Sequence, residues 1–370
     1  MNRIFSFRVA GKMAVLCAAL AVSGMLTLSS CEKKQAGSDK QTTSVCYGSD
    51  DNNGASGSVG KGAGHQTLSS IATVAGFRTI EGSSAVEVFF NENTEFFTVT
   101  DAATIATLKT AFSNNSALRI TFDPWQGVLV KVATPSASDE AAIKSRVNVS
   151  GASGAFAVDF TKMTDDVINE PAGMGILNTT DPGLNNLIPD FATAQLMFDY
   201  ITRQCCELPG PYAIDYCIPF QYCIDGCYAR AHKMCWIINN RYKYGTKKIF
   251  SFANAGSDKL CVQGQKWGGC CIRWWYHVAP LVTIKTPTGP KAYVFDPAMF
   301  NQPVLLATWL HAQENPACAG SFNPHVTMIN VQPTTSYAPS GSSGMSFSTD
   351  PMYTATNNTL DNYSALITCP

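Results

Sequence analysis

The chain has 370 residues, with 26 Lys plus Arg against 27 Asp plus Glu, so its formal net charge is −1. This balance provides neither the basic excess typical of nucleic-acid binding nor an acidic excess that would attract a cationic partner. We therefore expect no nucleic-acid partner. The length predicts two domains more readily than one, each large enough to bury a core.

The first 31 residues have the layout of a bacterial lipoprotein signal peptide. Basic residues precede an uncharged apolar stretch, Met13–Leu28, and a Leu-Ser-Ser-Cys box ends at Cys31. We expect Cys31 to be lipidated, so that the exported protein is held at the outer membrane or cell surface by its lipid anchor alone. Ordinary signal-peptide cleavage is the alternative, and release after processing stays open. No other window of about 18 residues is apolar enough to predict a spanning helix.

Residues 32–67 and 68–183 predict a flexible tether and a small α+β domain. The tether is rich in Gly, Ser, Asp and Asn, which cannot bury a core. In the domain, Val, Phe and Thr bounded by turn residues predict five strands: Ala85–Phe90, Glu95–Thr100, Leu118–Phe122, Gly127–Ala133 and Ala155–Phe160. Helices are expected from Asp101 and after Ser138. Without cysteines or clustered catalytic residue types, we interpret this domain as structural or regulatory.

A run rich in Gly, Asn and Pro, from Ala172 to Gly183, predicts a linker to a C-terminal domain at residues 184–370. Asp190 is expected to cap a helix there that turns three side chains toward a core: Leu196, Phe198 and Ile201. Eleven of the 14 cysteines lie beyond residue 200, and in an exported protein most should be paired. Cys206 and Cys217 bracket a Pro-Gly-Pro loop and are the favoured disulfide.

The odd number of cysteines leaves one thiol without a partner in this domain, unless Cys46 completes the pairs. Cys227 is our candidate for a nucleophilic thiol because it follows Asp225 and Gly226 and opens a helix-compatible run. The partial positive charge and free N–H groups of a helix N-terminus stabilise a thiolate and can hold an oxyanion. On cysteine count alone, a disulfide role for Cys227 would be the better interpretation.

A histidine and an acid follow on predicted strands. His277 lies in the apolar run Trp274–Ile284, and Asp296 stands where the next strand, Ala292–Phe295, ends. Cysteine at a helix start, then histidine and a carboxylate on neighbouring strands, is the order of a papain-like or transglutaminase-like site. His277 would take the thiol proton and Asp296 would orient its ring. Three neighbours are candidate pocket walls: Trp274, Trp275 and Tyr276.

Three separated motifs resemble the bacterial protein-glutaminases: Asp225–Met234, the pair Cys270 and Cys271 before Tyr276, His277 and Val278, and the Asp296, Pro297 corner. The resemblance covers residues 184–300. It implies an α+β, papain/transglutaminase-like catalytic domain, made as a proenzyme whose N-terminal domain, residues 68–183, covers the site. It also implies a catalytic triad of Cys227, His277 and Asp296. The stretch from Ala253 to Gly269 is longer than this family leads us to expect.

The activity that the resemblance implies is deamidation of glutamine in proteins. The thiolate would attack the side-chain amide, ammonia would leave, and water would hydrolyse the thioester, with no cofactor required. The expected partners are protein or peptide substrates bearing glutamine, and the chain is expected to be a monomer. A cysteine protease or a transglutaminase would use the same triad, and a non-catalytic, surface-binding lipoprotein stays open.

A zinc site is the competing use of four residues: Cys223, Cys227, His232 and His277. No second ligand pair follows at matching spacing. We expect His232 to pack or bind backbone, and Arg230 and Lys233 to lie on a solvated helix face.

Overall fold

The computed structural model describes residues 67–124, 126–144, 149–150, 156–172, 181–208, 216–254, 256–264, 269–341 and 346–366. The predicted signal peptide, the lipidation site Cys31, nearly all of the tether and most of the predicted linker lie outside these residues. The described residues belong to one compact unit. None of their helices combines the length and apolar character needed to cross a membrane.

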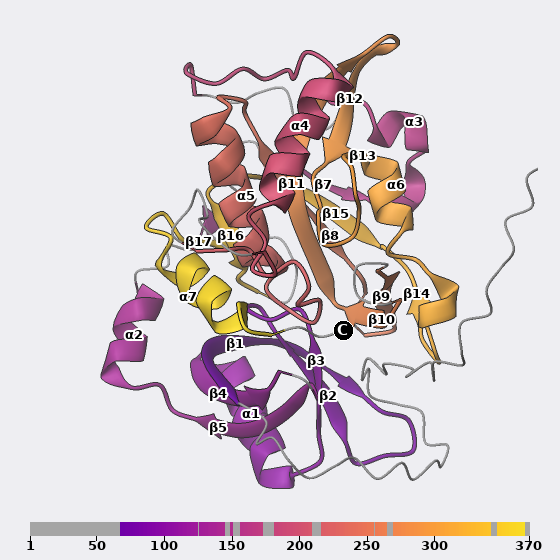
Figure 1. The fold of residues 1–370 in the computed structure, drawn as a ribbon. Coiled ribbons are helices and arrows are strands. Elements are labelled where there is room, and N and C mark those ends of the chain that lie inside the picture. Colours follow the sequence, from indigo (N-terminus) through magenta and orange to yellow (C-terminus); the bar gives the residue numbers. More distant parts are fainter. Residues whose placement is uncertain are drawn as a thin grey trace, which may run out of the picture. The chain divides into compact units, whose positions relative to one another are not determined.

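The N-terminal part is a five-stranded antiparallel sheet with two helices (Figure 1). Its strands, in spatial order, are β3 (Phe96–Val99), β2 (Val86–Phe90), β1 (Leu68–Thr79), β4 (Ala117–Asp123) and β5 (Val128–Ala133). The sequence predicts four of them, whereas Ser, Thr and Gly obscure the pattern of the central strand β1. The Asp101 carboxylate accepts the N–H of Thr104 at 2.7 Å and so begins α1 (Ala102–Ser113), as predicted. The second predicted helix is α2 (Ala137–Lys144).

A six-stranded antiparallel sheet forms the centre of the C-terminal part. Its strands, in spatial order, are β13 (Val304–Leu305), β12 (Gly289–Val294), β11 (Tyr276–Thr286), β8 (Lys247–Phe252), β15 (Met328–Pro333) and β7 (Phe156–Asp159). Helices α4 (Phe191–Thr202) and α5 (Cys227–Arg241) pack against β11, and α6 (Leu306–His311) packs against β12 and β13 (Figure 1). The apolar run of β11 is buried from Tyr276 to Ile284 because it lies inside this sheet and beneath the helices.

Smaller elements complete the C-terminal part. One three-stranded sheet contains β10 (Cys271–Trp274), β9 (Asp258–Gln263) and β14 (Asn323–Pro324); another contains β16 (Ser336–Pro339), β17 (Ser346–Thr349) and β6 (Val149–Ser150). The remaining helical elements are η1 (Phe160–Lys162), α3 (Asp165–Ile168), η3 (Pro316–Cys318) and α7 (Thr354–Tyr363). The predicted α+β class is confirmed.

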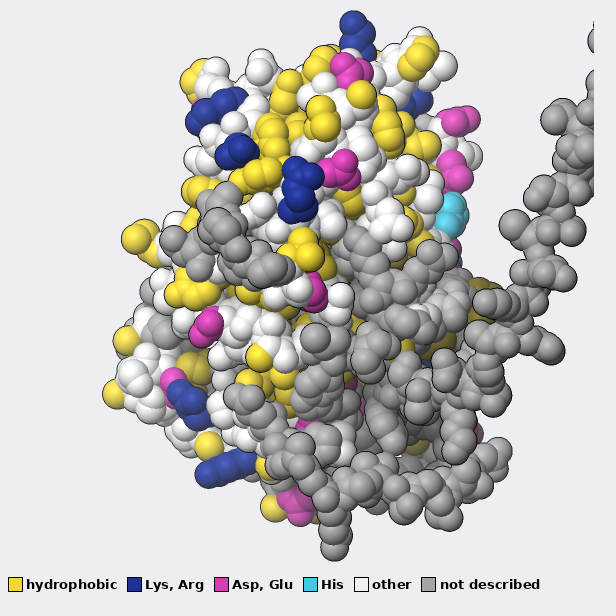
Figure 2. All heavy atoms as spheres, viewed as in Figure 1, with side chains coloured by type: hydrophobic (Ala, Val, Ile, Leu, Met, Phe, Trp, Pro, Cys, Tyr) yellow, Lys and Arg dark blue, Asp and Glu magenta, His cyan; other side chains and the backbone are white. Residues whose placement is uncertain are grey.

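Helix α4 differs from the prediction in one side chain. Asp190 caps it as expected, accepting the N–H of Thr193 at 2.7 Å, and Phe198 and Ile201 are buried. Leu196, expected in the core, is 69% exposed because the buried stripe runs through Ala194 and the positions three, four and seven residues beyond it. Figure 2 shows hydrophobic side chains among polar ones over this helix-covered side of the sheet.

Strand β7 lies in the C-terminal sheet, although its residues were expected to belong to the N-terminal domain. It pairs with β15, from Asp159 opposite Met328 to Phe156 opposite Val331. The segment that follows also packs there: the side-chain oxygen of Asn169 accepts the N–H of Ala307 at 3.0 Å. The connecting segment is therefore built into the C-terminal part.

Replacing Ile168 tests this docking, because its side chain is fully buried whereas that of its neighbour Val167 is 49% exposed. We expect Ile168→Ala to lower the free energy of unfolding by about 2–5 kcal/mol, and Val167→Ala by about 0.5 kcal/mol or less. Urea unfolding of the full chain measures both. Equal effects of the two substitutions would contradict the docking.

Candidate active site

Cys227 occupies the first position of α5 and is buried. Gly226 before it adopts φ = 85°, and a Cβ there would lie 2.8 Å from the Tyr363 ring, so the turn into the helix requires glycine. The backbone N–H of Val278 donates to the Cys227 sulfur. Since Val278 follows His277 on β11, this contact brings the thiol beside the predicted histidine.

His277 and Asp296 form a buried pair. The distance from His277 Nε2 to Asp296 Oδ2 is 2.8 Å, and both side chains are at most 4% exposed. Trp309 on α6 donates its indole N–H to the same carboxylate oxygen at 2.9 Å. Among the residues described, His277 Nδ1 is buried without a hydrogen-bond partner. The two ring nitrogens of His277 thus differ, since Asp296 holds only one of them.

Two indoles enclose the His277 ring. Trp274 stacks on it with centroids 4.4 Å apart, and Trp309 with centroids 5.4 Å apart. This packing restricts rotation of the imidazole and excludes water, which strengthens its interaction with Asp296. Trp274, one of the three candidate wall residues, thus lies directly against His277.

The charges of the site differ from those of an ionised, reactive thiol. Burial raises the pKa of Cys227 far above its usual value, although the nearby charge of Arg230 opposes the rise. Burial also acts to raise the pKa of Asp296, but the electrostatic interaction with His277 and the hydrogen bonds from His277 and Trp309 outweigh it, so its pKa is lowered. Burial therefore favours the neutral form of the Cys227 thiol, whereas the hydrogen bonds to Asp296 favour its ionised form.

Arg230 and Lys233 were expected on a solvated face, but both are buried. Arg230 Nη1 donates to the carbonyl oxygens of Tyr222 at 2.9 Å and of Asp225 at 2.8 Å. These hydrogen bonds connect the segment before Cys227 to the first turns of α5.

The turn between β2 and β3, residues 91–95, covers the site. The Thr94 backbone N–H donates to Asp225 Oδ1 at 2.9 Å, and the Thr94 carbonyl accepts the backbone N–H of Trp275 at 3.1 Å. The indole N–H of Trp275 donates to the Asn93 carbonyl at 2.8 Å, and the Tyr276 hydroxyl donates to the Asn91 carbonyl at 3.2 Å. Trp275 and Tyr276, two of the three candidate wall residues, thus donate hydrogen bonds to the N-terminal domain.

Sequence reasoning did not single out Asp225 or Trp309 for the site. Asp225 Oδ2 also accepts the hydroxyls of Tyr228 at 3.0 Å and Tyr363 at 2.7 Å. Its position directly before Gly226 and the cysteine was a usable signal. Trp309 lies in an apolar run that reads as core, and nothing in the sequence reveals the partner of its indole.

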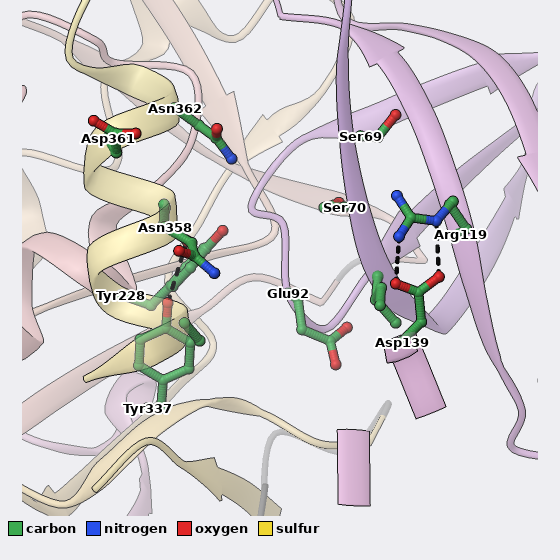
Figure 3. Close-up of a pocket in the computed structure, with 13 residues that line it drawn as sticks. Ser69, Ser70, Glu92, Arg119, Asp139, Tyr228, Tyr337, Asn358, Asp361 and Asn362 are labelled. Carbon is green, nitrogen blue, oxygen red and sulfur yellow. Dashed lines mark hydrogen bonds and ion pairs between the residues drawn. The ribbon is translucent and has the colours of Figure 1, made fainter. Parts of the chain in front are cut away.

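A polar cavity of about 410 Å³ separates the two parts beside this contact (Figure 3). The N-terminal domain lines it with Ser69, Ser70, Glu92, Arg119 and Asp139, and the C-terminal part with Tyr228, Tyr337, Asn358, Asp361 and Asn362. Polar groups that already face a gap lose little when the parts separate. Direct hydrogen bonds thus join the two parts at the 91–95 turn, and a cavity interrupts their contact beside it.

The cysteines divide into bridged and thiol forms. Cys206 and Cys217, the favoured pair, form a disulfide, as do Cys271 and Cys318. Cys227 is a thiol. In the described part of the chain no three His, Cys, Asp or Glu side chains gather to hold a metal ion, so the four proposed zinc ligands do not form a cluster there. His232 binds backbone as expected, at 3.2 Å from the Asp350 carbonyl.

A family model described as Glutaminase matches residues 194–313. Crystal structures of pro-protein-glutaminase and of a mutant of it are 27% identical to the chain, with a TM-score of 0.58. The match spans 81% of this chain and 93% of each solved chain. The NMR structure of protein-glutaminase from Chryseobacterium proteolyticum is 33% identical, covers 50% of this chain, is covered over 93%, and gives a TM-score of 0.43. The chain belongs to the protein-glutaminase family. No curated protein matches it.

The match to the pro-form gives the two parts their names. The chain is a protein-glutamine glutaminase, a hydrolase of protein substrates, with a pro-domain and a catalytic domain on a mixed α+β fold. Its family and its zymogen form agree with the sequence resemblance.

Trp309→Phe removes one donor to Asp296 while keeping an aromatic ring. A hydrogen bond to a charged group contributes about 1.5–3 kcal/mol, so we expect kcat/KM of the processed enzyme to fall about tenfold or more. Because the lost donor lowers the pKa of Asp296, activity should also be lost at a higher pH than in the wild type as the solution is acidified.

Ammonia release over a pH series measures both effects. Trp236→Phe, at a position 37% exposed on α5, is the control. A slower variant with an unshifted pH profile would show that Trp309 only fills space.

Glu95, in the turn that contacts the catalytic part, is expected to make the stability of the uncut chain pH-dependent. Burial, with a further contribution from Asp225, raises the pKa of Glu95 well above its ordinary value of 4.5. The folded form therefore retains a proton on Glu95 that the unfolded chain releases, so the contribution of Glu95 to stability is fully present below pH 4.5 and is lost as pH rises through the raised pKa.

Thermal unfolding of the uncut chain from about pH 5 to pH 8 tests this dependence. Glu95→Gln should unfold at a temperature that changes less with pH, whereas Glu81→Gln, at an exposed position, should follow the wild type. If both variants follow the wild type, Glu95 is not the titrating group.

Proposed function

We propose that the enzyme hydrolyses the side-chain amide of protein glutamine to glutamate with Cys227, His277 and Asp296 as its triad. The observation that carries the proposal is the buried His277–Asp296 bond of 2.8 Å, with Nδ1 of the same ring left open on the strand that contacts Cys227. A base oriented by an acid, next to a thiol at a helix start, is the arrangement that activates a cysteine nucleophile.

In the first half of the reaction, His277 Nδ1 takes the proton of the Cys227 thiol. The sulfur attacks the side-chain carbonyl carbon, and free N–H groups in the first turn of α5 stabilise the oxyanion. The imidazolium then protonates the amide nitrogen as the C–N bond breaks. Ammonia leaves, and a thioester joins the substrate to Cys227.

In the second half, water replaces ammonia. His277 takes a proton from the water as its oxygen attacks the thioester carbon, and the C–S bond then breaks. The thiolate regains its proton from His277, and the product is glutamate. Asp296 remains ionised throughout and stabilises the positive ring in both halves.

The pro-domain inhibits this reaction in our proposal. Its 91–95 turn lies on the segments before Cys227 and His277 and binds Asp225 and Trp275, which keeps protein substrates from the thiol. Its removal would also let water reach Cys227, whose high pKa is caused mainly by burial.

The test is to cut the linker near Leu184, incubate the product with casein, and follow ammonia release together with intact mass. We expect ammonia and a gain of about one mass unit for each converted amide, with the uncut chain silent. Cys227→Ala should abolish both signals. Cys235→Ala removes another buried thiol of the same helix and should keep them.

Other outcomes would move the assignment. Shortened casein chains without ammonia would identify a cysteine protease, and ammonia with crosslinked chains would identify a transglutaminase. Silence of the cut wild type, once its severed segment has been separated from it, would reject the proposed activity and favour a binding protein.

A further inference from the structure

A second contact between the pro-domain and the catalytic domain centres on Lys259 of β9. Its ammonium donates to Glu87 Oε1 of the pro-domain at 3.0 Å, and the two side chains are 4% and 1% exposed. The ammonium also lies over two aromatic rings, 4.3 Å from the centroid of Phe96 in the pro-domain and 3.9 Å from that of Phe322 in the catalytic domain.

The catalytic-domain side of this contact is a set of three residues that we call the cationic rim: Lys259, Arg273 and Phe322. The Arg273 guanidinium lies 5.7 Å from the Phe322 ring, and its Nε donates to the Cys318 carbonyl at 2.8 Å. A Cβ at Gly320, which adopts φ = 61°, would lie 2.7 Å from Arg273, so the loop allows this close approach only with glycine.

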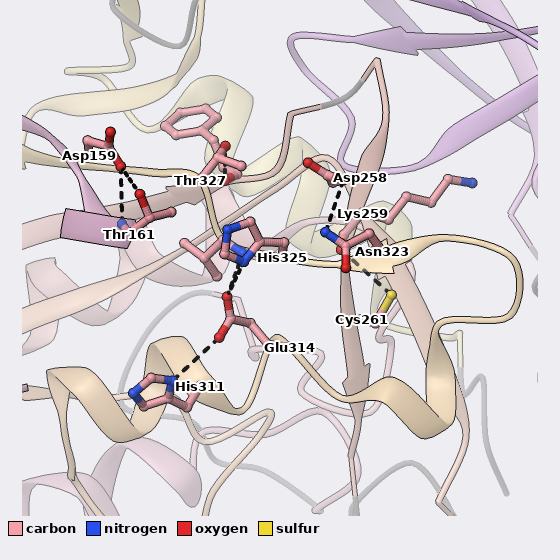
Figure 4. A network of polar contacts seen from close by, with 12 residues as sticks. Asp159, Thr161, Asp258, Lys259, Cys261, His311, Glu314, Asn323, His325 and Thr327 are labelled. Carbon is pink, nitrogen blue, oxygen red and sulfur yellow. Dashed lines mark hydrogen bonds and ion pairs between the residues drawn. The ribbon is translucent and has the colours of Figure 1, made fainter. Parts of the chain in front are cut away.

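The rim is fixed within the catalytic domain itself. The disulfide Cys271–Cys318 joins β10 to the loop before Phe322. The Lys259 carbonyl accepts the N–H of His325 at 3.2 Å, and Asn323 donates to Asp258 at 3.3 Å. Figure 4 shows the Lys259 side chain pointing away from this polar network. The rim is therefore expected to persist when the pro-domain leaves.

The rim and the candidate site are contacted by neighbouring residues of the pro-domain. The Phe96 ring lies over Lys259, and Thr94, two residues earlier, binds Asp225 and Trp275, the neighbours of the candidate triad residues. All of β9 lies in the stretch from Ala253 to Gly269 that is longer than the family resemblance predicts. The rim is thus a feature at the edge of the site, where a substrate chain would extend beyond its glutamine.

Departure of the pro-domain takes Glu87 away from Lys259. In the closed form, burial lowers the pKa of Lys259 to about 8, and the charge of Glu87 opposes that shift. Once Glu87 and Phe96 leave, two cations beside an aromatic ring are open to solvent. An anionic group from another chain can then take the place of Glu87.

We propose that the cationic rim of the processed enzyme binds an acidic side chain of the protein substrate, so that glutamines with Glu or Asp nearby are deamidated first. The proposal rests on the proposed function and adds a substrate class to it. Charge complementarity carries it, because the residue seated on Lys259 in the proenzyme is itself an acid.

The test compares peptides that differ only near a single glutamine, with Glu in one series and Ser in the other, at each position from two to five residues away. Ammonia release by the enzyme, prepared as the full chain and then cut in the linker, gives the ratio of kcat/KM for each pair. We expect Glu to be favoured about two- to fivefold at low salt in the best pair, and the preference to fade near 1 M salt.

Lys259→Gln should abolish the preference, and Lys259→Glu should reverse it in favour of a Lys-bearing peptide. Lys285→Gln, at an exposed position on β11, is the control and should keep it. The proposal that the rim binds an acidic substrate side chain would be overturned if the wild type showed no preference for the Glu peptide. It would also be overturned if the Lys259 variants kept that preference.

A binding measurement separates this proposal from the reaction. Processed Cys227→Ala should bind the Glu peptide more tightly than its Ser partner in fluorescence anisotropy, and the difference should vanish when Lys259→Gln is added. If no peptide loses ammonia, the proposed function fails. The measured affinities still decide whether the rim binds an acidic side chain. Equal affinities for both peptides would reject it.

Discussion

The buried carboxylate of Asp296 is the constraint on which the site depends. A charge removed from water must be paired and hydrogen-bonded, and here His277 and Trp309 supply the donors. These residues come from β11, the end of β12 and α6, so their contacts form only when the sheet has its register and α6 has docked. Because burying the Asp296 charge is costly without these donors, the positions of His277 and Trp309 depend on correct folding of the sheet and docking of α6.

The pro-domain supplies hydrogen-bond partners for polar groups that it buries at the surface of the site. Asp225, the Trp275 backbone and Lys259 are polar groups that sit under the pro-domain, and each finds a partner on it. Buried polar groups without partners would weaken the closed form. The groups that the enzyme exposes after processing are therefore satisfied in advance by the segment that covers them.

The sequence predicted what depends on local chemistry. Asp101 and Asp190 cap their helices because a cap needs only its own turn. Of the three residues that the sequence proposed as a triad, His277 and Asp296 share a hydrogen bond, and Cys227 contacts the residue after His277. It did not predict what depends on distant packing. The buried state of Arg230 and the exposed state of Leu196 follow from neighbours far along the chain, and the glycine- and serine-containing strand β1 is recognisable only once its partners are in place.

Strand β7 has a consequence for activation. It precedes the predicted linker in sequence but is hydrogen-bonded to β15 in space. A cut in that linker therefore yields two chains that share one sheet, and freedom from the inhibitor requires a dissociation step after the peptide bond is broken. Dissociation obeys mass action, so crowded molecules recapture their severed segment whereas dilute ones lose it. If the proposed cut activates the enzyme, the place of one short strand would thus make activation depend on the concentration of the enzyme.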